Sequence, residues 1–156
     1  MKKFTNYLSL LILCLSISMS FLTSCDKEED EPKVMTDPAG YIAGTYVGTG
    51  YLYDYLFGTT DEEYQGMKIV LTKSSYEFIN VELYLANGNT FFSGSTPTTY
   101  QITQLASGSF MLTNSQVPEA KITVDKKGQV LDFYYPYVSK GEYNYYAIKF
   151  TGNKQY

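Results

Sequence analysis

Tyrosine is concentrated in two short segments of this chain, and both could form a binding surface. Tyr51-Leu52-Tyr53-Asp54-Tyr55 and Tyr134-Tyr135-Pro136-Tyr137 each hold three tyrosines. A tyrosine ring has a large apolar face and one polar tip, and tyrosine is enriched at binding surfaces. We expect a stacking platform for a sugar ring or another flat apolar surface, with core lining and cross-strand pairing as the structural alternative. The candidate ligand-binding residues are Tyr51, Tyr53, Asp54, Tyr55, Tyr134, Tyr135 and Tyr137.

The residue types that are missing limit the chemistry further. The chain has no His and no Trp, and its 12 basic residues are all lysines. Without His, the usual proton shuttle, the Ser-His-Asp arrangement and common zinc sites cannot be built. Without Arg, bidentate clamps on phosphates or carboxylates are missing. We therefore expect no catalytic residue, no metal site and no cofactor, and we interpret the chain as a non-enzyme.

Carboxylates are the acid–base groups that remain. Glu77, Glu82, Asp132 and Glu142 lie on expected strands or at their ends. A glycosidase would need two carboxylates facing each other across a cleft. Exposed, solvated carboxylates are the more common arrangement, and we favour that interpretation here.

The N-terminus has the pattern of an export signal. Met1-Lys2-Lys3 is basic, and Tyr7 to Leu22 is an apolar run shorter than the ~20 residues that span a bilayer. Such a segment is typical of a secretory signal, with an uncleaved membrane anchor as the alternative. Leu22-Thr23-Ser24-Cys25 resembles the bacterial lipobox. The resemblance implies that residues 1–24 are removed and that Cys25 receives the lipid that anchors the protein to a membrane.

An acidic tract, Asp26-Lys27-Glu28-Glu29-Asp30-Glu31, follows the cysteine. Like charges keep such a segment extended and solvated. The tract also resembles the one that follows the lipidated cysteine in lipoproteins of Bacteroidetes, which implies a lipid-anchored protein at the outer membrane, exposed at the cell surface. Removal of Lys2 and Lys3 with the signal would change the net charge from −4 to −6. Nucleic acid is therefore not an expected partner.

Residues 25–40 are expected to form a lipidated, flexible linker, and residues 41–156 a single β-barrel domain. Apolar residues alternate with polar ones along this domain, which is typical of half-buried strands. The alternation predicts that Ile79, Val81, Leu83, Ile122 and Val124 are buried. Strands are expected near 44–56, 67–73, 76–85, 90–94, 99–105, 109–113, 120–125, 129–136 and 143–151.

Turn signals separate these strands, among them Asn87-Gly88 and Ser107-Gly108. Asp61-Glu62-Glu63 is expected to be a solvated acidic loop. Short strands at hairpin spacing predict an all-β fold, an antiparallel up-and-down meander that closes into a small barrel of about eight strands. A β-sandwich is the alternative. Gly44, Gly48 and Gly50 in the first strand indicate places where backbones approach closely.

Two segments resemble the calycin-like (lipocalin-like) small lipoproteins of Bacteroidetes. They are Ala43-Gly44-Thr45-Tyr46-Val47-Gly48 and the closing Ala147-Ile148-Lys149-Phe150-Thr151-Gly152. The resemblance implies a small closed or nearly closed barrel. Lipocalins place a Gly-x-Trp beneath an Arg of a late strand; here Tyr46 replaces the Trp, and Lys149 is the candidate for the Arg.

Two functions of different classes remain. The first is a small binding module at the cell surface or outer membrane, for glycans or for a lipid-like molecule in the barrel mouth. The second is a structural or accessory subunit that contacts a partner protein.

Overall fold

The computed structural model describes residues 34–54, 56–91, 98–140 and 143–156, without the side chains of 137–145. The barrel lies in the compact unit Pro32–Tyr156. The expected signal, Cys25 and the acidic tract lie outside the described residues. Within the described ranges, no helix is long and apolar enough to cross a membrane.

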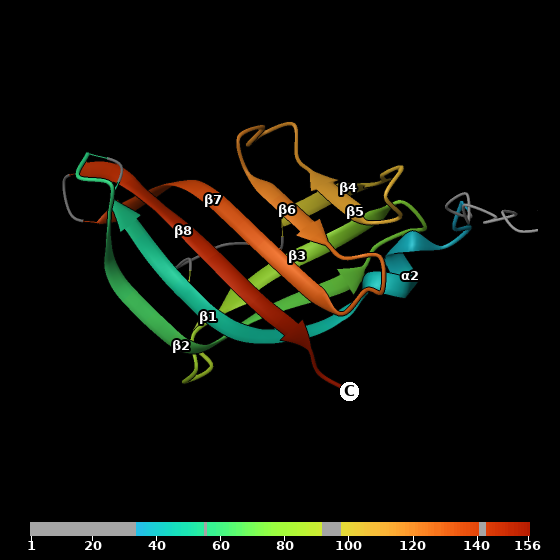
Figure 1. Cartoon of the computed structure of the whole chain (residues 1–156), viewed down its shortest axis with the longest axis horizontal. Helices are drawn as coiled ribbons and strands as arrows, with labels where there is room; N and C mark the ends of the chain where they lie inside the picture. The colour runs from blue at the N-terminus through green and yellow to red at the C-terminus, as the bar shows by residue number, and fades with distance from the viewer. Residues whose placement is uncertain (1–33, 55, 92–97, 141–142) are drawn as a thin grey trace, which may run out of the picture. The chain divides into compact units, whose positions relative to one another are not determined.

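The described chain is an antiparallel β-barrel with one short helix. Each strand pairs with the next along the chain, and β8 pairs with β1 to close the barrel (Figure 1). The predicted all-β meander is confirmed, and the closed barrel replaces the sandwich alternative. The elements are α2 (Pro38–Ile42), β1 (Gly44–Asp54), β2 (Thr59–Lys73), β3 (Phe78–Tyr84), β4 (Thr98–Gln104), β5 (Phe110–Thr113), β6 (Lys121–Val124), β7 (Val130–Lys140) and β8 (Tyr143–Lys154).

Apolar side chains from all eight strands fill the barrel interior. The five residues predicted to be buried are confirmed, since none is more than 7% exposed. The largest fully buried side chains include Tyr46, Tyr100, Phe110 and Phe150. Period-two alternation therefore sorts the side chains between a packed core and the outer wall.

Two local predictions were wrong or only partly met. Asp61-Glu62-Glu63 is not a loop, because β1 continues to Asp54 and pairs with β2 across this segment. The three carboxylates stay exposed, so pairing of the strands does not remove them from water. In the expected strand 90–94, Thr90 makes only an isolated bridge to Tyr84, and residues 92–94 lie outside the described residues.

The helix α2 closes one end of the barrel. The side chain of Asp37 caps it by accepting from the Gly40 amide at 2.9 Å, and it pairs with Lys73 at 2.7 Å. The Lys73 hydrogen bond and the Gly40 amide lower the pKa of Asp37. Ala39 and Ile42 are fully buried against the core. The folded unit therefore begins before the expected boundary at Tyr41.

Tyr46 ties this end together. Its hydroxyl lies 2.8 Å from the carbonyl oxygen of Ile42 and 3.0 Å from that of Gly128. The expectation about Lys149 was wrong: Lys154, not Lys149, lies directly opposite Tyr46 in the pairing of β1 with β8. The Lys154 ammonium donates to the carbonyl oxygen of Tyr41 at 2.9 Å, and burial lowers its pKa.

Candidate functional site

The tyrosines of the first predicted segment lie on the outer wall of the barrel. Gly50, Leu52 and Asp54 point inward along β1, so Tyr51 and Tyr53 between them point outward. Lys149 of β8 lies opposite Tyr51, and its ammonium is 3.9 Å from the centre of the Tyr53 ring. This contact is a cation–π interaction. Tyr51 and Tyr53 therefore share one face of β1, while Tyr55 lies outside the described residues.

The second segment is split between the two faces of β7. Tyr134 lies opposite Lys149 and points outward with it. Tyr135 points inward, where its ring stacks on Phe133 with centroids 6.2 Å apart. Burial, and secondarily Tyr135, raise the pKa of the buried Tyr100 to about 12. The side chain of Tyr137 lies outside those described.

The described candidate residues therefore do not all lie on one surface. Tyr51, Tyr53 and Tyr134 share the outer wall, whereas Asp54 and Tyr135 belong to the interior. Asp54 is only 9% exposed, and its carboxylate accepts from the amides of Leu56 and Phe57. Whether the outer tyrosines contact a ligand stays a prediction.

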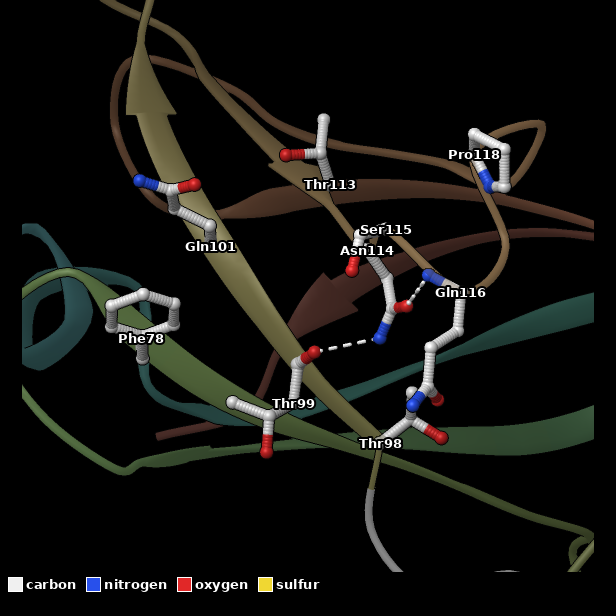
Figure 2. Close-up of a pocket in the computed structure, with 9 residues that line it drawn as sticks. All are labelled: Phe78, Thr98, Thr99, Gln101, Thr113, Asn114, Ser115, Gln116 and Pro118. Atoms are coloured by element: carbon white, nitrogen blue, oxygen red, sulfur yellow. Dashed lines mark hydrogen bonds between the residues drawn. The ribbon is translucent and has the colours of Figure 1, made fainter.

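A second surface, which we call the polar groove, lies on the outer wall of β3, β4 and β5. It encloses about 650 Å³. Figure 2 shows Phe78 on one side of it and the connection from β5 to β6 on the other. The described lining residues are Phe78, Thr98, Thr99, Gln101, Thr113, Asn114, Ser115, Gln116 and Pro118.

Strand register builds the floor of the polar groove. Phe78 lies opposite Gln101, and Gln101 lies opposite Thr113, so the three form one row across β3, β4 and β5. Each is the outward neighbour of a buried residue, because inward and outward positions alternate. Phe78 is 40% exposed. An aromatic ring is thus held beside a carboxamide and a hydroxyl.

Asn114 fixes the far wall of the groove. Its side-chain NH₂ group donates to the backbone carbonyl oxygen of Thr99 at 2.8 Å, and its side-chain oxygen accepts from the backbone amide of Gln116 at 2.7 Å (Figure 2). These bonds tie the connection between β5 and β6 to β4. The groove is therefore held by side-chain bonds across the chain as well as by the sheet.

The lining chemistry suits binding. Hydroxyl and carboxamide side chains can both donate and accept hydrogen bonds, and none of the nine described lining residues is ionisable. Among the residues that the structure describes, no group of three or more Asp, Glu, His or Cys side chains could hold a metal ion. The groove can therefore recognise a neutral, hydroxyl-rich molecule through polar contacts and one aromatic face.

Sequence reasoning missed this groove. Phe78 carried a signal, because it is an aromatic residue on the outward face of the alternating run 77–85. The threonines and carboxamides carried none, since outward polar residues occur on every half-buried strand. Register alone brings them together.

No protein-family model, curated protein or solved structure matches this chain. The calycin-like resemblance rests on the quoted segments, and the barrel itself rests on the structure.

Proposed function

We propose that this chain is a glycan-binding module held at the cell surface by a lipid anchor, with the polar groove as its binding site. The observation that carries the proposal is the composition of the groove: an exposed phenyl ring in one row with a carboxamide and a hydroxyl. Sugar rings present hydroxyls at their edges and an apolar C–H face. A few placed polar groups beside an aromatic surface fit that pattern.

The uncharged lining favours neutral glycans over acidic ones. A sulfate or uronate group would leave water without gaining a charged partner from the nine lining residues, and an unpaired charge is costly to desolvate. Neutral oligosaccharides carry no such cost.

Between glycans and lipid-like molecules, the packed interior supports glycans. The inward positions of the described strands are filled by large side chains such as Tyr100, Phe110 and Phe150. A lipid tail within the barrel would have to displace them, and packed cores resist such changes.

Lipidation of Cys25 and outer-membrane exposure are the second half of the proposal. Two sequence features support both: the Leu22-Thr23-Ser24-Cys25 segment that follows a short apolar run, and the acidic tract after it. A lipid anchor stable enough to retain the barrel needs more than one acyl chain, which lipidation of an N-terminal cysteine can provide.

A glycan screen tests the binding function. Protein spanning residues 32–156 is applied to arrayed neutral and acidic oligosaccharides, beside Phe78→Ala and Tyr76→Ala variants. Tyr76 is an exposed aromatic residue two positions from Phe78, outside the nine described lining residues, and serves as the matched control. We expect neutral glycans to bind the wild type and the Tyr76→Ala variant, and binding to fall about fivefold in Phe78→Ala, since aromatic contacts contribute about 1 kcal/mol.

Equal binding by both variants would place the ligand outside the polar groove. A screen in which no glycan binds would favour the accessory subunit that contacts a partner protein.

A further inference from the structure

Two adjacent large apolar side chains are exposed at the far end of the barrel. Leu56 is 65% exposed and Phe57 is 77% exposed, in the connection between β1 and β2. We call this pair the Leu56–Phe57 tip. α2 precedes β1, so the tip and α2 lie at opposite ends of that strand (Figure 1).

A buried carboxylate holds the backbone of the tip. The Asp54 side chain accepts from the amides of Leu56 at 2.7 Å and Phe57 at 3.2 Å. The Asp54 carbonyl oxygen accepts from the Gly58 amide at 3.0 Å, and Gly58 adopts a φ of 65°. Asp54 occupies an inward position that follows the buried Leu52. The nearly buried Asp54 carboxylate thus fixes the backbone conformation of an exposed apolar turn.

This arrangement lowers the cost of placing the tip in an apolar medium. Backbone amides that enter lipid without a partner are expensive, but the amides of residues 56–58 already have one. Residues 56–60 carry no charged side chain. The tip can therefore leave water without exposing unpaired amides or a charge.

The neighbouring charges select the kind of surface. Asp61, Glu62 and Glu63 lie exposed on β2, just beyond the tip. An anionic bilayer would repel these three carboxylates, whereas a zwitterionic bilayer would not. The proposed anchor at Cys25 would bring a bilayer close, because the segment 26–33 spans at most about 28 Å.

We propose that the Leu56–Phe57 tip inserts into the surface of a zwitterionic bilayer and gives the barrel a second membrane contact beside the lipid anchor. The proposal rests on the proposed function only for the lipid anchor, and it does not depend on glycan binding at the polar groove.

A single tryptophan reports on the insertion, because the chain has none of its own. Phe57→Trp places an indole at the tip, and Tyr76→Trp places one at a site that is 65% exposed beyond the other end of β2, as a control. The lipid-modified mature proteins, which begin at Cys25, are reconstituted in vesicles of phosphatidylcholine, with and without brominated acyl chains. We expect Phe57→Trp emission to shift to shorter wavelengths and to be quenched by bromine, and Tyr76→Trp emission to do neither. Phosphatidylglycerol vesicles should weaken the effect.

Flotation separates the two proposals. Protein that floats with vesicles while the Phe57→Trp indole stays unquenched overturns tip insertion and keeps the anchor. Wild-type protein that does not float overturns both. A wavelength shift that depends on protein concentration without lipid would assign the tip to a second copy of the chain and also overturn insertion.

Discussion

At the scale of single residues, the tyrosine hydroxyl of Tyr46 performs a structural role. Its one proton is shared between the carbonyl oxygens of Ile42 and Gly128, which joins α2 to the connection between β6 and β7. Tyr46→Phe keeps the ring and leaves both carbonyls without this donor. We expect a loss of about 1–3 kcal/mol in the free energy of unfolding, measured by urea denaturation.

Tyr41→Phe is the matched control for this prediction. Its hydroxyl reaches the Lys126 carbonyl oxygen at 3.3 Å from a ring that is 38% exposed, so water can replace the bond. The control should unfold at the wild-type urea concentration. Equal stability of both variants would mean that the shared proton of Tyr46 contributes nothing.

Tyr100 makes stability depend on pH in the alkaline range. Burial raises its pKa to about 12 from the usual 10.0. The native state therefore holds the proton more tightly than the unfolded state, and this stabilisation is complete below pH 10 and lost as the pH rises from 10 towards 12. The loss should reach roughly 2–3 kcal/mol. Urea midpoints measured at pH 9 and pH 11.5 should differ less in Tyr100→Phe than in the wild type, and an unchanged difference would contradict the assignment.

At the scale of elements, the pairing of β1 with β8 depends on Gly48. It lies opposite Gly152, and a Cβ at Gly48 would come within 2.0 Å of the Thr151 carbonyl oxygen. A Cβ at Gly50 would instead meet the flexible end of the Met67 side chain. We expect Gly48→Ala to lose about 3 kcal/mol or more, at the upper end for overpacking, and Gly50→Ala clearly less. Thermal unfolding of the two variants compares them; equal melting temperatures would contradict the close approach.

The sequence predicted most strands because alternation is a local property. Residues such as Ile79 and Ile122 reveal their faces from their neighbours alone. The length of β2 could not be predicted in this way. Asp61 to Glu63 have no apolar face, and they become a strand because β1 offers paired backbone groups on the other side. Strand ends are thus decided by the partner strand.

Faces were also predictable where alternation was applied strictly. Tyr134 and Tyr135 are adjacent in a strand, so their side chains had to lie on opposite faces of the sheet. This alternation excluded a single platform that holds both rings. The polar groove, in contrast, depends on the register of Phe78, Gln101 and Thr113 across three strands. Sequence spacing alone does not fix that register.

At the scale of the whole molecule, the proposed lipid anchor would decide where the barrel works. We expect mass spectrometry of protein extracted from membranes to find Cys25 acylated and N-terminal, with residues 1–24 absent. Cys25→Ser should block processing or release the protein. An intact Met1 peptide in the membrane-bound form would contradict the lipobox interpretation.

The most direct test of glycan binding at the polar groove is a nuclear magnetic resonance titration. A neutral oligosaccharide that binds in the screen is added to isotope-labelled protein spanning residues 32–156, and backbone amide shifts are followed. We predict that the shifts concentrate at Phe78, at 98–101 and at 113–117, while the amide shifts of Tyr51, Tyr53 and Tyr134 stay unchanged. Shifts centred on those three tyrosines would contradict the account and return the binding site to the tyrosine face.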